Sequence, residues 1–355
     1  MSDAKVTRDG LEGTRPGREA RLWSQGAELD DSGDAPNSVR VGWGAGQRRQ
    51  RRRNDGEFSS YYGEPIINPP VWGERDIAGY LFAGGLAGAS SILAAGGDLS
   101  RRPRLARRCK LCAAGALGVS LVALVHDLGR PERFVNMLRT FKPTSPMSIG
   151  SWLLAVYGPL NAAALLSDVF RRAPRAGRTA SVAAGALGAG VASYTGALIA
   201  NTAVPAWHGG HRELPFLFVA SAASAAAGFA LIAAPAAESD PARRLAVLGA
   251  TSEIIAEQVM ERRLGMVAET LHQGKAGRRL KTAKALTVLG ALGAATLASR
   301  SRLAASLSGA ALLTGSALTR FGLFEAGMSS ARDPKYTVEP QRERLAAQAV
   351  PDPQA

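Results

Sequence analysis

The stretch His126–Trp152, HDLGRPERFVNMLRTFKPTSPMSIGSW, decides how this chain folds. It is rich in Arg, Lys, Pro and Ser, and it separates two apolar runs that are each long enough to cross a membrane. A spanning helix satisfies its own backbone in lipid, so irregular, charged backbone belongs at the water boundary, in a protein-lined cavity or against a partner. We therefore expect the working site here, with Asp127 and Arg130 where one span ends and Ser148 and Trp152 where the next begins.

Outside this stretch, the apolar residues lie in one block between about residues 77 and 325, and both ends of the chain are polar. The sequence predicts an all-α fold, a polytopic transmembrane helix bundle of about eight spans. The spans are expected at about 77–97, 109–127, 147–167, 180–203, 214–236, 243–265, 283–299 and 303–325. Residues 1–57 are interpreted as a disordered polar N-terminal tail, 58–330 as the transmembrane domain and 331–355 as a polar C-terminal tail.

The chain is strongly basic, with 43 Lys and Arg against 29 Asp and Glu and a net charge of +14. The arginines mostly border the apolar runs, which favours a role in membrane topology and contact with anionic lipid over nucleic-acid binding. The short basic loops at 98–110 and 168–180 would be cytoplasmic by the positive-inside rule. The opposite face carries Lys275, Arg278, Arg279, Lys281 and a basic tail, so the charge bias is slight and the orientation is left open. The bias toward Ala, Gly and Arg is typical of a bacterium of high genomic GC content, hence a bacterial plasma membrane.

Few residues of the chain are suited to metal or redox chemistry. Cys109 and Cys112 are interpreted as two small apolar side chains, because too few further ligands surround them for a metal site. A haem held across a bundle needs histidines on facing helices, and this spacing does not offer them. The four histidines are His126, His208, His211 and His272.

The sixth expected span carries Glu253, Glu257 and Glu261 at i, i+4 and i+8, which places all three carboxylates on one helical face. This helix either lies in the membrane interface or spans with that face turned inward. Because a carboxylate inside a membrane is costly, Glu253 and Glu257 are predicted to act as a proton relay. Glu261 is expected at the surface.

Several other residues have two readings. Asp127 and Arg130 either pair while leaving a group for a ligand, or form a structural ion pair. Tyr194, in the middle of a span, either bonds to a neighbouring helix or meets a ligand carbonyl. Arg320 either reaches the interface or faces the bundle interior. Trp152 and Trp207 near span ends are by default typical of an interfacial aromatic belt.

Four ordered blocks together closely resemble the NrfD / polysulfide reductase membrane-subunit family, over roughly residues 58–340. They are YLFAGGLAG at 80–88, the stretch at 126–152, SYTGALIANTAVPAW at 193–207 and RFGLFEAGMSSARDPKY at 320–336. The resemblance implies an eight-span, haem-free anchor that binds a quinone (menaquinone or ubiquinone) and docks an iron–sulfur subunit. That subunit in turn serves a molybdopterin catalytic subunit, such as polysulfide reductase or a formate-dehydrogenase-like enzyme. The chain itself would hold no haem and no iron–sulfur cluster.

By this resemblance the quinone pocket lies near the loop around 128–147, and the quinone-contacting tyrosine is Tyr194. Asp127, Arg130 and Trp152 are the further candidate quinone-binding residues, with Asp127 able to exchange a proton. First-span polar contacts known in some members have no His or Asn counterpart in this chain. Whether the subunit is non-catalytic or itself quinone-reactive is left open.

Two alternatives belong to other classes of protein. In a secondary transporter, Asp127, Glu253 and Glu257 would form one ion site near the membrane midplane. In a purely structural membrane anchor, none of them would take part in redox chemistry.

Overall fold

The computed structural model describes residues 5–7, 10–12, 67–127, 136–139 and 141–349. The chain divides into two compact units, Met1–Ser59 and Ser60–Ala355. In the first unit, β1 (Lys5–Thr7) and β2 (Gly10–Glu12) pair as a two-stranded antiparallel sheet. Most of the expected N-terminal tail, residues 1–57, otherwise lies outside the described residues, so its disorder stays a prediction.

The second unit is helical wherever the structure describes regular secondary structure in it. Its eight long helices are α2 (Glu74–Leu99), α3 (Pro103–Asp127), α5 (Pro146–Phe170), α6 (Pro174–Ala200), α8 (Leu214–Ala233), α9 (Asp240–Leu264), α11 (Gly274–Thr296) and α12 (Arg302–Arg332). Shorter helices are α7 (Pro205–Gly209), η1 (Ala236–Glu238), η2 (Gly265–Ala268), α10 (Glu269–His272) and α13 (Lys335–Ala349). The predicted all-α bundle is confirmed.

Each expected span corresponds to one long helix. Among the described helices, five are long and apolar enough to cross a membrane: α2, α3, α5, α6 and α8. The other three carry more charge; α9, for example, contains the three glutamates of the sixth expected span. The chain is therefore a multi-pass membrane protein, and the number of eight spans stays a prediction.

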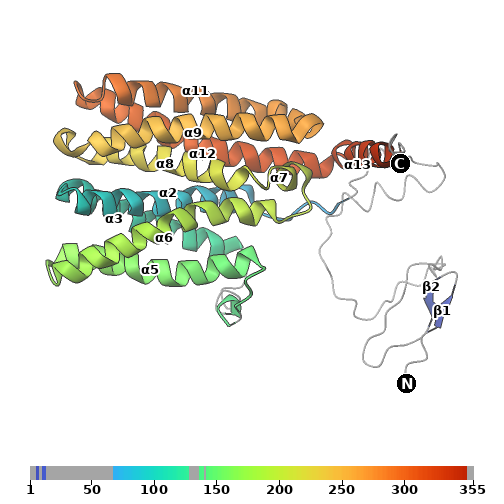
Figure 1. Ribbon diagram of the computed structural model, residues 1–355, viewed down its shortest axis with the longest axis horizontal. Coiled ribbons are helices and arrows are strands. Elements are labelled where there is room, and N and C mark those ends of the chain that lie inside the picture. The colour runs from blue at the N-terminus through green and yellow to red at the C-terminus, as the bar shows by residue number, and fades with distance from the viewer. Residues whose placement is uncertain (1–4, 8–9, 13–66, 128–135, 140, 350–355) are drawn as a thin grey trace, which may run out of the picture. The chain divides into compact units, whose positions relative to one another are not determined.

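The long helices form two bundles with the same internal arrangement (Figure 1). In the first bundle α2 packs on α3 and α6, while α5 packs on α6 and α3. In the second bundle α8 packs on α9 and α12, while α11 packs on α12 and α9. Contacts of α8 with α2 and α6, and of α12 with α2, join the bundles. Because successive helices alternate in direction, α2 and α8 both begin at the end of the molecule where α13 lies, here called the α13 end.

Within each bundle, glycines bring the first and the last helix into backbone contact. A Cβ on Gly88 of α2 would overlap the carbonyl oxygen of Gly188 on α6, and a Cβ on Gly228 of α8 would overlap that of Gly309 on α12. Small residues allow such close approach between membrane helices. The first helix of each bundle thus crosses the last one without intervening side chains.

Trp207 of α7 is buried, with 1% of its surface exposed, so its assignment to an interfacial belt was wrong. The short helix α7 turns the indole inward, where Nε1 donates to the carbonyl of Leu323 at 2.9 Å. The ring stacks on Trp72 at 5.8 Å between centroids and also contacts Phe324. A buried indole needs a hydrogen-bond acceptor, and α12 supplies it.

The two cysteines lie on α3, and both are buried and free. Cys109 is part of an apolar core, and the Cys112 sulfur accepts a hydrogen bond from the Ser90 hydroxyl at 3.4 Å. Their burial agrees with the interpretation as two small apolar side chains.

Candidate functional site

A cavity of about 140 Å³ lies near the α13 end of the first bundle, and α2, α3, α5 and α6 all contribute to it. Its wall is mainly apolar, with two phenols, one carboxylate and one hydroxyl as the polar side chains. It is lined by Trp72, Ile77, Tyr80, Leu81, Leu124, Asp127, Met137, Met147, Ser151, Leu154, Tyr194, Leu198 and Ile199.

The two phenols hydrogen-bond to each other across the interface of α2 and α6, through the hydroxyl groups of Tyr80 and Tyr194. Both residues are buried, with 2% and 8% of their surface exposed. The first reading of Tyr194 is therefore confirmed, since its hydroxyl bonds to a neighbouring helix. The residue also lines the cavity, and contact with a ligand carbonyl there stays a prediction. Tyr80 was not singled out from the sequence, although it opens one of the four blocks that carry the family resemblance.

Asp127 is the last residue of α3 and lines the cavity at its outer edge. Its Oδ1 accepts a long hydrogen bond, of 3.4 Å, from the backbone N–H of Gly73, and Nδ1 of the preceding residue, His126, lies 3.1 Å from Oδ2 of Asp76. The carboxylate thus lies between the protein interior and the end of the bundle. Arg130 is outside the described residues, so its pairing with Asp127 stays a prediction.

Trp152 does not line this cavity. Its side chain is 38% exposed and packs edge-on against Phe141, with ring centroids 6.1 Å apart. The neighbouring Ser151 lines the cavity instead, and its hydroxyl donates to the carbonyl of Met147 at 2.9 Å. The helical rotation between adjacent residues places Trp152 on the outer face of α5.

Gly150 of α5 lies directly against the ring of Tyr194. A Cβ at this position would come within 2.6 Å of Tyr194 Cδ2, which is closer than non-bonded carbon atoms pack. The absence of a side chain at Gly150 therefore fixes where the phenol can lie. Only the position of a glycine within an apolar span pointed to this in the sequence.

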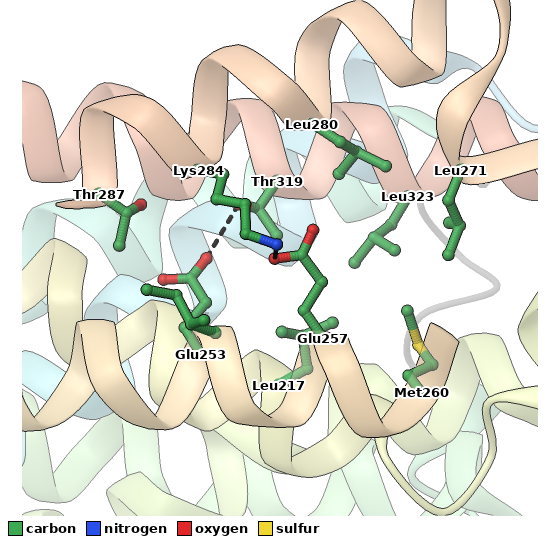
Figure 2. A pocket seen from close by; sticks show the side chains of 11 residues that line it. Leu217, Glu253, Glu257, Met260, Leu271, Leu280, Lys284, Thr287, Thr319 and Leu323 are labelled. Carbon is green, nitrogen blue, oxygen red and sulfur yellow. Dashed lines mark hydrogen bonds and ion pairs between the residues drawn. The ribbon is translucent and has the colours of Figure 1, made fainter. Parts of the chain in front are cut away.

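A second, smaller cavity of about 20 Å³ lies in the second bundle (Figure 2). Glu253 and Glu257 point from α9 toward α11 and α12. Oε1 of Glu253 accepts a hydrogen bond from the hydroxyl of Thr319 at 2.9 Å, and Oε2 of Glu257 lies 3.3 Å from Nζ of Lys284. The glutamate face of α9 is therefore turned inward, as the second of the two readings of this helix expected.

The third glutamate lies nearer the α13 end. The side chain of Glu261 is 24% exposed and lies 3.7 Å from Nε2 of His272. The side chain of Glu257 is 17% exposed, whereas Glu253 as a whole is 4% exposed. Exposure therefore increases along the glutamate face toward the α13 end.

Arg320 faces the bundle interior, with 1% of its surface exposed. Its Nη2 donates to the carbonyl of Phe218 at 2.7 Å, and its guanidinium lies 3.8 Å from the centroid of the Phe218 ring. Such stacking is favourable for a desolvated cation. The sequence had left this side chain between the interior and the interface, and the structure decides for the interior.

The family described as "Polysulphide reductase, NrfD" matches residues 66–267, more than half of the chain. The chain belongs to the NrfD family. The match begins just before α2 and ends within η2, so it includes the whole first bundle together with α8 and α9 of the second. No curated protein matches the chain.

The histidines of this NrfD-family protein gather at the α13 end. His208 and His211 stack with ring centroids 5.7 Å apart, while His126 and His272 each lie beside a carboxylate. Among the described residues, no group of three or more His, Cys, Asp or Glu side chains is placed to hold a metal ion.

Proposed function

We propose that this NrfD-family protein is a haem-free quinone- and quinol-binding membrane subunit. It anchors an iron–sulfur subunit and exchanges electrons between the quinone pool and a molybdopterin-type oxidoreductase, of the polysulfide reductase or formate-dehydrogenase-like kind. The observation that carries the proposal is the cavity of the first bundle, with the phenols of Tyr80 and Tyr194 and the carboxylate of Asp127. Family membership supports it, because NrfD proteins are generally quinone-interacting subunits of such complexes.

The size and lining of the cavity suit a quinone ring. A protein cavity of about 150 Å³ accepts a benzene ring, and this one measures about 140 Å³. Its walls combine aromatic and aliphatic side chains with a few polar groups, the usual composition of a site that orients a small apolar ligand. The space holds one ring, so an isoprenoid tail would lie outside it.

A bound quinone supplies two-electron, two-proton redox chemistry. The chain's own residues would bind and orient it. Tyr80 and Tyr194 can each donate a hydrogen bond to a ring carbonyl once they release each other. Asp127 lies at the cavity edge, where its carboxylate can exchange a proton with water at the α13 end.

The position of the cavity bears on where the iron–sulfur subunit docks. Electrons pass between a quinone and a cluster only over short distances, and the cavity lies near the α13 end. We therefore place the iron–sulfur subunit on that end. The positive-inside rule applied to the basic loops at the opposite end would put the α13 end outside the cytoplasm, in a bacterial plasma membrane.

The transporter alternative required Asp127, Glu253 and Glu257 to form one site. Asp127 lines the cavity of the first bundle, whereas Glu253 and Glu257 line the separate cavity of the second. No described residue lines both cavities. This separation supports the quinone proposal over a single midplane ion site.

Quinone content and quinol-linked turnover of the purified complex test the proposal. Tyr194→Phe and Asp127→Asn should each lower turnover while the complex still assembles. Tyr157→Phe is the matched control, because Tyr157 is a buried phenol of the same bundle that bonds to Ser91 and does not line the cavity. Unchanged turnover in both cavity variants would refute the assignment of the quinone site to this cavity.

The partner assignment has its own test. The tagged protein is isolated from membranes in mild detergent, and its stoichiometric partners are identified by mass spectrometry. Recovery of an iron–sulfur subunit with a molybdopterin protein is the expected result. A chain recovered alone, without quinone, would contradict the proposal.

A further inference from the structure

The second bundle repeats the helix arrangement of the first but carries different chemistry in its cavity. The first cavity has neutral phenols, whereas the second is lined by Glu253, Glu257 and Lys284. Each of these three side chains is ionisable, and α9 and α11 bring them together from positions about thirty residues apart. A cavity of this kind does not suit an apolar ring, because charged groups lose hydration without new partners.

Two polar atoms in this cavity have no hydrogen-bond partner among the described residues. They are Oε2 of Glu253 and the hydroxyl of Thr287, and both residues are more than nine-tenths buried. Buried polar atoms normally find a protein or water partner. The cavity of about 20 Å³ is large enough for one water molecule. A water there can bond to Glu253 and Thr287 and reach the neighbouring Glu257–Lys284 pair.

Charged and polar groups from the neighbouring helices surround Glu253. The guanidinium of Arg320 on α12 lies nearby, and Lys284 of α11 lines the same cavity beside Glu257. Glu257 on the same helix adds a second carboxylate, and α8 contributes the hydroxyl of Ser221. A carboxyl group with a countercharge and a second carboxyl group close by can exchange a proton with that neighbour.

Ionisable groups lead away from Glu253 in one direction only along α9. Glu257 and Glu261 follow toward the α13 end, where Glu261 meets the half-exposed His272. In the other direction α9 carries no ionisable side chain between Arg244 and Glu253. The ionisable side chains of α9 therefore connect Glu253 to the α13 end of the bundle only.

We propose that the second bundle contains a proton-exchange site that ends at Glu253 and is reached from the α13 end through Glu257, Glu261 and His272. On uptake, Glu257 first takes a proton from the Glu261 and His272 side. It passes this proton to the cavity water, which gives one to Oε2 of Glu253, so that Glu257 returns to the carboxylate paired with Lys284 and one proton has entered for the one held. Release follows the same steps in reverse. Lys284 holds Glu257 in position, and Arg320 supplies the countercharge when Glu253 is ionised.

Infrared spectroscopy of the purified protein in lipid tests this site directly. A protonated carboxyl group gives a carbonyl band that shifts when its proton is exchanged for deuterium. The pH-difference spectrum should contain such a band, and Glu253→Gln should remove it while keeping an acceptor for Thr319. Glu257→Gln should slow deuterium exchange of the band severalfold. The control Glu269→Gln, which changes an exposed carboxylate at the same end, should alter neither property.

The outcomes separate this proposal from the quinone assignment. The band should persist in Tyr194→Phe and in protein depleted of quinone, because the two cavities share no lining residue. A wild-type spectrum without a pH-dependent carboxyl band would overturn the proposal, whatever the variants do. Deuterium exchange that is equally fast in Glu257→Gln would overturn the route.

Discussion

Gly150→Ala is expected to weaken quinone binding because the new methyl group would displace the ring of Tyr194. The new methyl group would lie 2.6 Å from Cδ2 of Tyr194, and the atom it meets belongs to a rigid aromatic ring. Either the phenol or α5 must move. In both cases the hydroxyl shifts relative to Tyr80 and to the cavity that the two residues line.

The magnitude follows from two opposing effects. Overpacking a tight interior costs about 1 to 3 kcal/mol, whereas replacing glycine by alanine inside a helix gains up to about 1 kcal/mol. The net loss of stability for Gly150→Ala is therefore about 0 to 3 kcal/mol. Loss of one hydrogen bond to the quinone costs about 0.5 to 1.5 kcal/mol, which weakens binding roughly two- to twelvefold.

The assay is quinone titration of the purified complex, with thermal unfolding measured on the same samples. Gly158→Ala is the matched control on the same helix, because its methyl group would meet only Leu117 Cδ2, at an ordinary 3.8 Å. The control should bind quinone as the wild type does and be at least as stable. Equal quinone affinity in both variants, or equal weakening, would refute the placement of Tyr194 in the quinone site.

Three further predictions concern the α13 end and the joints between helices. Gly327→Ala should lower both stability and quinone affinity, because its methyl group would overlap Trp207, which stacks on Trp72 in the wall of the first cavity. Thermal unfolding and quinone titration check this. Arg302→Ala should destabilise the protein by about 1 to 2 kcal/mol in thermal unfolding, since this exposed guanidinium bonds three carbonyls at the end of α8. The hydrogen bond and charge of Lys335 lower the pKa of Glu269, so their pairing persists above that lowered pKa and is lost as the pH falls through it. A spin label on α13 should become more mobile in acid, and Glu269→Gln should abolish that pH dependence.

The helices were predictable because each apolar run long enough to span a membrane has to satisfy its backbone internally. The glutamate face of α9 was predictable for a similar reason, since side chains four residues apart lie on one face of a helix. What that face would meet was not predictable. Lys284 lies on another helix, and only the packing of α11 on α9 places it beside Glu257.

The cavity of the first bundle was predictable only in part. Asp127 was found because a carboxylate follows an apolar run, and Tyr194 because of the family resemblance. Tyr80 gave no separate signal, since an aromatic residue near the start of an apolar helix is ordinary. Trp152 lies one helical step from Ser151, which lines the cavity, because a polar stretch marks the neighbourhood of a site but not the rotation of the helix that follows it. Its part in quinone binding stays a prediction.

The two bundles show why similar packing can support different chemistry. In both, a cavity lies among all four helices, because glycine contacts between the first and last helix fix the same framework. The side chains then decide what each cavity accepts. Neutral phenols can bond to each other when the space is empty and to a carbonyl when it is filled, so the larger cavity tolerates exchange of an apolar ligand. Buried charges have no such freedom, because an unpaired charge costs several kcal/mol. The smaller cavity is therefore restricted to water and protons.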